Sequence, residues 1–473
     1  MKGKLQWILM ALALAVFATG CDKEEEEEKE PTETEILNQW IWDVMNDVYF
    51  WAEDVPQDLD PMEESDPEAF FYKLLHPDDR FSWIVDDYEE LQKSFNNIEE
   101  GNGISPYFIR ISGTDEVILV AAYIVKGSPA DDAGLKRGDI VTRINDQVIT
   151  IDNYLDLFYA DEVALEFADY DEEANTLTAN GKEVTLQAEV IDENPVHHYE
   201  VIDYEDLKIG YLVYNQFTGG ENDKYRTALD NVFTEFVSEG IDDIVIDLRY
   251  NPGGSVNMAT HIGSVLSPPS VTSKEDIFVR YQWNDYYQDY FTNNPDYGPE
   301  SDYLVQLLEK DPSVDLGLPD VYFMTSGRSA SASELLIIGV DPYLDVTQIG
   351  DYTNGKFYGS ITIPDTEEPA RHTWAMQPIV FKYTSATGYS GFVDGLEPDF
   401  EVYDDLLTAR PFGDITDPIL ARTLEAITGV SPIATKRLPV KPGYEVLPDP
   451  VRELRNRLTM PLPDKGPLVY PAN

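Results

Sequence analysis

Apolar residues recur at helical spacing from residue 36 onward. Two neighbouring rows of this helix carry Ile36, Trp40, Val44 and Val48 and, beside them, Leu37, Ile41 and Met45. Thr32 and Glu35 stand where a capping box would begin it, and shorter helices are predicted at 66–75 and 86–95. We therefore expect a small helical domain at 36–98, whose core takes up the aromatic residues Trp40, Trp42, Trp51, Phe70, Phe71 and Trp83.

The pattern changes to alternating strands and helices in the second half of the chain. Residues 244–248 form a nearly continuous apolar run, which is typical of a strand buried on both faces of a parallel sheet. Similar runs at 321–324 and 346–349 flank an apolar helix at 333–340. Strand, helix and strand in this order predict βαβ units. The fold class that we expect is α/β within a multidomain α+β chain.

Two stretches depart from this pattern. Residues 268–320 are rich in Tyr, Asp and Asn, and we expect them to be an insertion near the rim of the functional site. Residues 431–473 hold nine of the 31 prolines and seven of the 33 basic residues. This locally basic tail either drapes over the acidic body of the protein or stays loosely ordered, and the sequence leaves both possibilities open.

The first residues have the features of an export signal. Two lysines precede an apolar run at 5–18, which is too short to span a bilayer comfortably. Cys21 follows small residues, so residues 1–20 resemble a bacterial lipoprotein signal peptide and Cys21 the residue that is lipidated; an ordinary signal peptide is the alternative. Residues 21–35 are either a plain acidic tether or, by resemblance, the surface-sorting signal of Bacteroidetes-type lipoproteins. The resemblance implies an exported lipoprotein of the outer membrane or cell envelope, on the periplasmic face or the cell surface.

Composition and charge exclude several classes of function. The 473 residues include 89 acidic and 33 basic ones, for a net charge of −56, which argues against nucleic-acid binding because that requires Lys and Arg to neutralise phosphates. A single cysteine excludes an intrachain disulfide and a cysteine-based zinc cluster. The acidic cluster at 171–173 lacks the twelve-residue calcium-binding pattern, so we expect no metal. Aromatic residues make up 12% of the chain, which is compatible with a packed core.

A segment in the first third closely resembles the signature of PDZ domains. Residues 127–141 combine a short helix after Ser-Pro-Ala, a glycine turn and a Gly-Asp-Ile-Val step into a strand. Such domains bind a peptide along a sheet edge, and a glycine-rich loop offers backbone N–H groups to its terminal carboxylate. The matching loop here consists of Gly101, Asn102, Gly103 and Ile104, which would otherwise be a plain turn. We expect the domain to cover residues 99–160.

Two segments carry the residues best suited to catalysis. Residues 247–254 begin at the carboxyl end of the apolar strand at 244–248 and end in a proline and paired glycines. Such glycines permit unusual backbone angles close to a reacting atom. Residues 329–334 read Ser-Ala-Ser-Ala-Ser-Glu before the helix at 333–340, and a serine at a helix start can expose its hydroxyl beside free backbone N–H groups. A tight turn and ordinary helix capping are the alternatives.

Together these segments resemble the C-terminal processing (tail-specific) proteases, which are serine peptidases with a Ser–Lys dyad and a PDZ domain. The resemblance covers residues 100–400 and implies a crotonase-like catalytic domain, here at 161–430. It implies Ser331 as the nucleophile and Lys356 as the general base; burial among aromatic residues would lower the pKa of this lysine. The implied oxyanion donors are the backbone N–H groups of Ala332 and of Gly253 or Gly254.

One position departs from the family pattern. The family often places a glutamine four residues after the lysine to orient it, and this chain has Ser360 there. Either Ser360 or another group orients Lys356, or the dyad is weaker. The resemblance implies a cofactor-independent serine endopeptidase that recognises protein or peptide substrates through a free C-terminus. The alternatives are a catalytically weak or inactive binding lipoprotein on the same fold, and an adaptor acting through its PDZ domain alone.

Overall fold

The computed structural model describes residues 31–299, 301–433, 443–449 and 459–460. The predicted signal peptide, Cys21 and the first ten residues of the predicted tether lie outside the described residues. Within the described ranges, no helix has both the length and the apolar character needed to cross a membrane.

The N-terminal region contains the three predicted helices, α2 (Glu33–Asp47), α3 (Pro67–Lys73) and α4 (Tyr88–Phe95). The capping box is confirmed: Glu35 N–H donates to Thr32 Oγ1 at 3.2 Å, and the Glu35 carboxylate accepts from Thr32 N–H. The region also contains two short strands, β1 (Trp83–Val85) and β2 (Ile98–Gly101), so it is not purely helical. Its apolar residues share one core with the central sheet, and all six predicted core aromatics are buried or packed against a core cluster.

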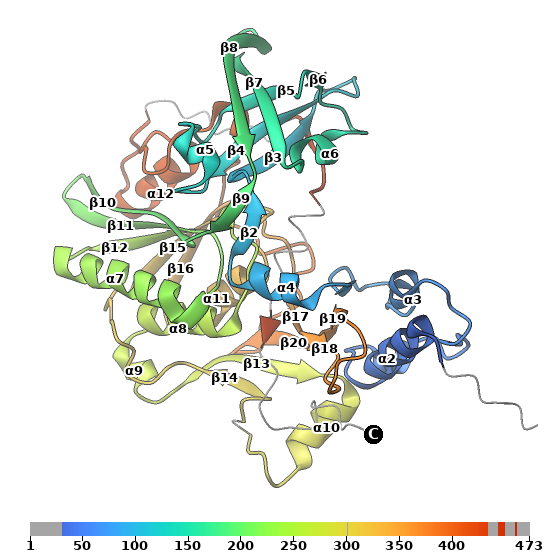
Figure 1. Cartoon of the computed structure of the whole chain (residues 1–473). Coiled ribbons are helices and arrows are strands. Elements are labelled where there is room, and N and C mark those ends of the chain that lie inside the picture. Colours follow the sequence, from blue (N-terminus) through green and yellow to red (C-terminus); the bar gives the residue numbers. More distant parts are fainter. Residues whose placement is uncertain (1–30, 300, 434–442, 450–458, 461–473) are drawn as a thin grey trace, which may run out of the picture.

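The PDZ region is a β-sheet whose elements appear at the top of Figure 1. Its elements are β3 (Ile104–Arg110), β4 (Val117–Ile124), α5 (Pro129–Asp132), β5 (Ile140–Ile144), β6 (Gln147–Val148), α6 (Tyr154–Phe158), β7 (Glu162–Asp171) and β8 (Thr176–Gln187). The strand order is β22-β3-β4-β5-β7-β8, where β22 (Glu445–Val446) comes from the C-terminal tail. The expected boundary at residue 160 is wrong, because the β7–β8 hairpin is hydrogen-bonded to β5 and extends the sheet to Gln187.

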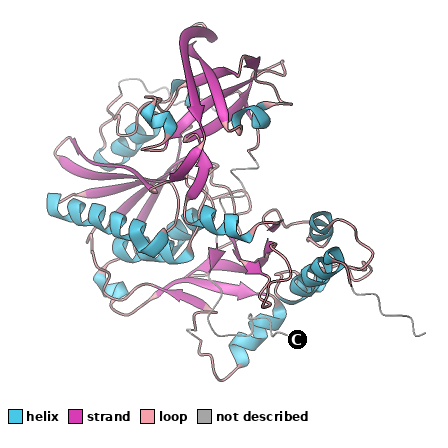
Figure 2. Ribbon diagram, in the orientation of Figure 1, coloured by secondary structure: helices cyan, strands magenta, loops and turns pink. Residues whose placement is uncertain are grey.

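A six-stranded sheet forms the centre of the molecule, in the order β10-β11-β12-β15-β16-β21. The strands are β10 (Val196–Tyr204), β11 (Leu207–Tyr214), β12 (Asp243–Asp247), β15 (Asp320–Thr325), β16 (Asp345–Gly350) and β21 (Phe400–Glu401). All pairs from β11 onward are parallel, which confirms the predicted βαβ units. Helices α7 (Lys224–Glu239), α8 (Val256–Leu266) and α11 (Ala332–Val340) share a core on one face, and α12 (Pro418–Thr428) packs on the other (Figure 2).

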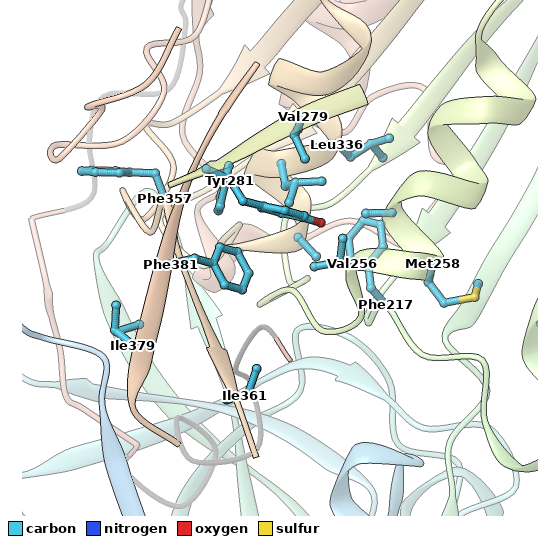
Figure 3. Close-up of a cluster of buried hydrophobic side chains, with 14 of the residues drawn as sticks. Phe217, Val256, Met258, Val279, Tyr281, Leu336, Phe357, Ile361, Ile379 and Phe381 are labelled. Atoms are coloured by element: carbon cyan, nitrogen blue, oxygen red, sulfur yellow. The ribbon is translucent and has the colours of Figure 1, made fainter. Parts of the chain in front are cut away.

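A second sheet encloses α11 from the opposite side. Its order is β14-β13-β20-β17-β23, from β14 (Val305–Leu307), β13 (Ile277–Trp283), β20 (Ile379–Ser385), β17 (Tyr358–Ile361) and β23 (Thr459–Met460). Leu336 of α11 joins Val256 of α8 and Tyr281 of β13 in one buried cluster (Figure 3). Every residue of α11 is buried, which explains why no polar side chain follows Glu334 in this helix.

The stretch 268–320 is more than an insertion at the rim. Besides α9 (Pro269–Thr272) and α10 (Asp285–Asn293) it supplies β13, an interior strand of the second sheet that pairs with both β14 and β20. Residues facing the core alternate with exposed ones along the second half of β13, a pattern that the many tyrosines and polar residues around it obscured. The remaining short elements are β9 (Glu189–Asp192), β18 (Ile363–Pro364), β19 (Ala375–Gln377) and the 3₁₀ turns at 52–54, 221–223 and 406–408.

Candidate active site

The two predicted catalytic segments meet at the carboxyl ends of the adjacent parallel strands β12 and β15. Ser329 Oγ donates to the Leu248 carbonyl at 2.7 Å, and Ser333 Oγ donates to the Asn251 carbonyl at 2.9 Å. Ala330 N–H donates to the same Asn251 carbonyl at 3.2 Å. The outer two serines of the motif therefore hold the start of α11 against residues 247–254, which we call the glycine loop.

The middle serine, Ser331, has a different environment. Its backbone has φ of 62° and ψ of −111°, a conformation that non-glycine residues rarely adopt. Its side chain is completely buried, and among the described residues no group forms a hydrogen bond with its hydroxyl. Ser331 is the residue that precedes α11, and its backbone N–H donates to the Glu334 carboxylate as in a capping box, but its positive φ differs from the extended conformation of an ordinary cap. Strained backbone and an unsatisfied buried hydroxyl are both features of functional sites.

The paired glycines lie directly against this serine. A Cβ on Gly253 would lie 2.7 Å from Ser331 Cβ and 3.0 Å from Ala332 N, and φ at Gly253 is +111°, so only glycine fits. The Gly253 N–H already donates to Asn251 Oδ1 at 2.9 Å. Ala332 is the first residue of α11, where helix N–H groups lack partners within the helix. This arrangement favours Gly254, rather than Gly253, as the second backbone donor beside Ala332.

Lys356 lies in the loop before β17, and its side chain is buried at 3% exposure. Its Nζ atom is 5.6 Å from the centre of the Phe81 ring, which comes from the N-terminal region. Lys356, Phe81, Ala330 and Pro252 line a cavity of about 530 Å³. The catalytic-motif residues of three separate segments thus border one cavity.

Glu334 connects the serine and lysine segments through its buried carboxylate. One oxygen accepts from Ser331 N–H at 2.7 Å and Lys356 N–H at 2.9 Å. The other accepts from Gly355 N–H at 2.7 Å and Thr353 Oγ1 at 2.6 Å. Burial raises the pKa of Glu334, and these four hydrogen bonds oppose that shift. The sequence motif contains Glu334, but the pattern alone assigned it no role.

Tyr383 makes a second connection between the same two segments. Its hydroxyl, on β20, lies 3.0 Å from the Ser331 carbonyl oxygen and 2.7 Å from the Lys356 carbonyl oxygen. No sequence signal pointed to Tyr383, because its link to both residues is made by backbone atoms. Ser360, the position that the family pattern gives to glutamine, is buried on β17, and its backbone pairs with Ile379 of β20. Glu334 and Tyr383 hold the backbone of the Lys356 segment.

The predicted carboxylate-binding loop borders a different cavity, of about 270 Å³, which also reaches Pro252. Gly103 has φ of +86° and packs against Ser128, and Ile104 N–H donates to Asn102 Oδ1 at 2.9 Å. One of the loop amides is therefore already bonded within the loop. The acidic residues Glu99, Glu100, Asp161 and Glu193 line the same cavity, and no lysine or arginine among the described residues does. These carboxylates oppose the binding of an anion.

A network of buried arginine and aspartate side chains lies beside the glycine loop. Arg249 is 1% exposed, and its guanidinium binds Asp247 at 2.7 Å and Asp417 at 3.1 Å. Asp404 lies 3.4 Å from Arg249 and 2.9 Å from Arg137 of the PDZ region. Burial alone would raise the pKa of Asp404, but the two guanidinium groups hold it below its ordinary value. In the described residues, no group of three or more His, Cys, Asp or Glu side chains is placed to hold a metal ion.

Comparisons with known proteins place these features in one family. The family model of Peptidase family S41 matches residues 208–402, that of the Peptidase S41 N-terminal domain matches 37–83, and that of the PDZ domain matches 120–168. The fold is similar to the crystal structure of an S41 protease-family protein from Bacteroides fragilis, with a TM-score of 0.68 and 26% identity over 82% of this chain and 97% of that one.

Curated relatives give the same assignment at greater distance. The chain is 23% identical over 376 residues to the "Probable CtpA-like serine protease" of Staphylococcus aureus, covering 76% of this chain and 63% of that protein. The protein of the same name from Staphylococcus haemolyticus is 21% identical over 318 residues, covering 66% of this chain and 55% of that protein. The chain thus spans less than two thirds of the length of these relatives.

Proposed function

Because this chain belongs to peptidase family S41, we propose that it is a serine-type peptidase that hydrolyses peptide bonds in protein or peptide substrates. The observation that carries the proposal is Ser331. It is the one serine of its motif whose hydroxyl is not used to hold the glycine loop, and it lies on a backbone connected to Lys356 by Glu334 and Tyr383.

The proposed reaction uses a Ser–Lys dyad. Neutral Lys356 takes the proton of Ser331 Oγ as that oxygen attacks the carbonyl carbon of the scissile bond. The backbone N–H groups of Ala332 and Gly254 stabilise the resulting oxyanion. Lys356 then gives the proton to the leaving amine, which departs and leaves an acyl-enzyme. Lys356 then takes a proton from a water molecule, which attacks the carbonyl carbon of the ester. As the bond to Ser331 Oγ breaks and the acid product leaves, Lys356 returns the proton to Ser331 Oγ.

We expect Glu334→Gln to lower kcat about 100-fold with little change in KM. The glutamine side chain would turn an NH₂ group toward N–H donors that now meet a carboxylate oxygen, so the Ser331 and Lys356 segments would shift. Misplacement of reacting groups by about 1 Å lowers the rate on the order of 100-fold. Thr353→Val, which removes one of the four donors to Glu334, is the matched control and should have a smaller effect. Steady-state kinetics on a fluorogenic peptide measure both. A kcat within about threefold of the parent in Glu334→Gln would contradict the positioning role.

For the substrate we propose a chain that docks on the PDZ region with a free C-terminus near the loop at 101–104. We expect a free carboxylate to improve kcat/KM by less than about tenfold over an amidated terminus. Exposed charge interactions contribute about 0.2–1 kcal/mol, whereas tenfold requires about 1.4 kcal/mol, and the acidic lining of this cavity opposes the gain.

Matched pairs of unstructured peptides with free or amidated ends, read by mass spectrometry, measure this preference. A preference above tenfold would mean that the loop binds the carboxylate despite its acidic surroundings. Equal cleavage of the free and the amidated peptides would show that the loop at 101–104 does not contribute to substrate recognition. Peptides that bind to the parent protein without being cut would favour the alternative, a non-catalytic binding protein on the same fold.

A further inference from the structure

A short segment of the C-terminal tail forms an extra strand on the PDZ sheet. β22 pairs antiparallel with the edge strand β3, with Glu445 opposite Arg110 and Val446 opposite Ile109. Leu447 N–H continues the ladder by donating to the Phe108 carbonyl at 2.8 Å. This arrangement is strand addition to a sheet edge, the mode by which PDZ domains bind peptides.

Side chains hold the same segment in the groove between β3 and α6. Leu447 packs against the apolar core of the PDZ region, which includes Phe108 and Phe158. The Tyr154 hydroxyl donates to the Pro448 carbonyl at 2.9 Å. The Asp449 side chain is buried, and its carboxylate accepts from the Tyr159 hydroxyl at 2.8 Å. An aliphatic side chain and a carboxylate two residues later therefore each meet a matching group.

The segment runs on toward the candidate active site instead of along the whole of β3. Pro106 and Pro448 lack N–H groups, so the ladder cannot continue past Phe108, and the Pro106 carbonyl accepts from Arg328 instead. Residues 446–449 line the same 530 Å³ cavity as Lys356 and Ala330. Farther along the tail, the backbone of β23 pairs with β17, the strand that follows Lys356. The tail therefore contacts both the PDZ edge and the catalytic region.

We propose that residues 443–449 occupy the peptide-binding groove of this protein as an internal ligand, so that a substrate must displace them to bind. The proposal rests on the proposed function, because it takes β3 as the edge on which substrates dock. It also names the chemistry that the groove selects: an extended segment with an aliphatic residue followed two positions later by a carboxylate, as in Leu447-Pro448-Asp449.

The test measures binding of the tail sequence supplied as a separate peptide. A fluorescent peptide Gly-Tyr-Glu-Val-Leu-Pro-Asp with both ends blocked is titrated against the full chain carrying Ser331→Ala, with and without Leu447→Asp. If the internal segment occupies the groove in at least nine tenths of the molecules, Leu447→Asp should tighten the apparent Kd by about tenfold or more, because apparent affinity scales with the open fraction. A peptide with aspartate in place of its leucine should bind neither protein.

Val446→Asp is the matched control, since it introduces the same charge one residue earlier on a side chain that is 43% exposed. We expect its apparent Kd to stay within about threefold of the parent. Equal affinity of the parent and Leu447→Asp, or no binding to either while both melt at the parent temperature, would overturn the proposal. Binding is measured without hydrolysis, so a protein that cleaves nothing leaves this test valid, and failure here leaves the peptidase proposal standing.

Discussion

Replacing Ser331 by alanine is expected to abolish peptide cleavage without destabilising the protein. The loss of kcat should be about 10⁴-fold or more, because a nucleophile acts as a unit with its base and the hydroxyls of Ser329 and Ser333 are both engaged by backbone carbonyls. The free energy of unfolding should stay equal or rise by up to about 1 kcal/mol, since the buried Ser331 hydroxyl makes no hydrogen bond among the described residues and its removal relieves an unsatisfied group. Peptide cleavage read by mass spectrometry and urea unfolding measure the two effects.

Ser333→Ala, two residues away on the same segment, is expected to have the opposite effects: it should lower the stability and leave peptide cleavage in place. Its hydroxyl donates to the Asn251 carbonyl at 2.9 Å, so its loss should cost about 1 kcal/mol of stability while cleavage persists. Residual cleavage in a clean preparation of Ser331→Ala would show that another residue is the nucleophile. Loss of cleavage in Ser333→Ala at unchanged stability would reverse the assignment of the two serines.

Replacing Arg249 by methionine is expected to lower the free energy of unfolding by about 3–5 kcal/mol. The substitution keeps the side-chain volume but leaves the buried carboxylates of Asp247 and Asp417 without their shared cation, and an uncompensated buried charge has this cost. Because Asp417 also accepts from the first N–H groups of α12, we expect α12 to loosen with the loop at 249–254. Urea unfolding of both proteins at neutral pH measures the difference.

Arg143→Met is the control for this experiment. Arg143 also binds a carboxylate, that of Glu166 at 3.0 Å, but the two side chains are 38% and 35% exposed, so its loss should cost less than about 1 kcal/mol. The effect of Arg249→Met should shrink as the pH falls below about 4. The lowered pKa of Asp404 contributes stability that is present above the unfolded value of about 3.9 and is lost as the carboxyl becomes protonated. Equal losses in the two arginine variants would contradict the buried network.

Features that depend on neighbouring residues were predictable from the sequence. The Thr32 and Glu35 capping box, the buried strand before Asp247 and the fully buried helix after Ser331 all follow from spacing within a few residues. The candidate catalytic groups are a different case, because Ser331 and Lys356 were identified by the resemblance of their motifs to a known family. Family resemblance then linked the two motifs, and the fold placed both beside the glycine loop.

Features that depend on distant backbone atoms were decided only by the tertiary structure. The Glu334 carboxylate and the Tyr383 hydroxyl bind main-chain groups of Ser331 and Lys356, and any residue type supplies such groups. The tail strand is a similar case: Arg110 meets Glu445 across 335 residues, and a two-residue strand beside prolines has no periodic pattern to recognise. The sequence by itself thus determined the local elements and, through family resemblance, the candidate catalytic residues, whereas only the fold decided what holds Ser331 and Lys356 in place and where the tail strand lies. The physical reason is that main-chain hydrogen bonds carry no residue-specific signal.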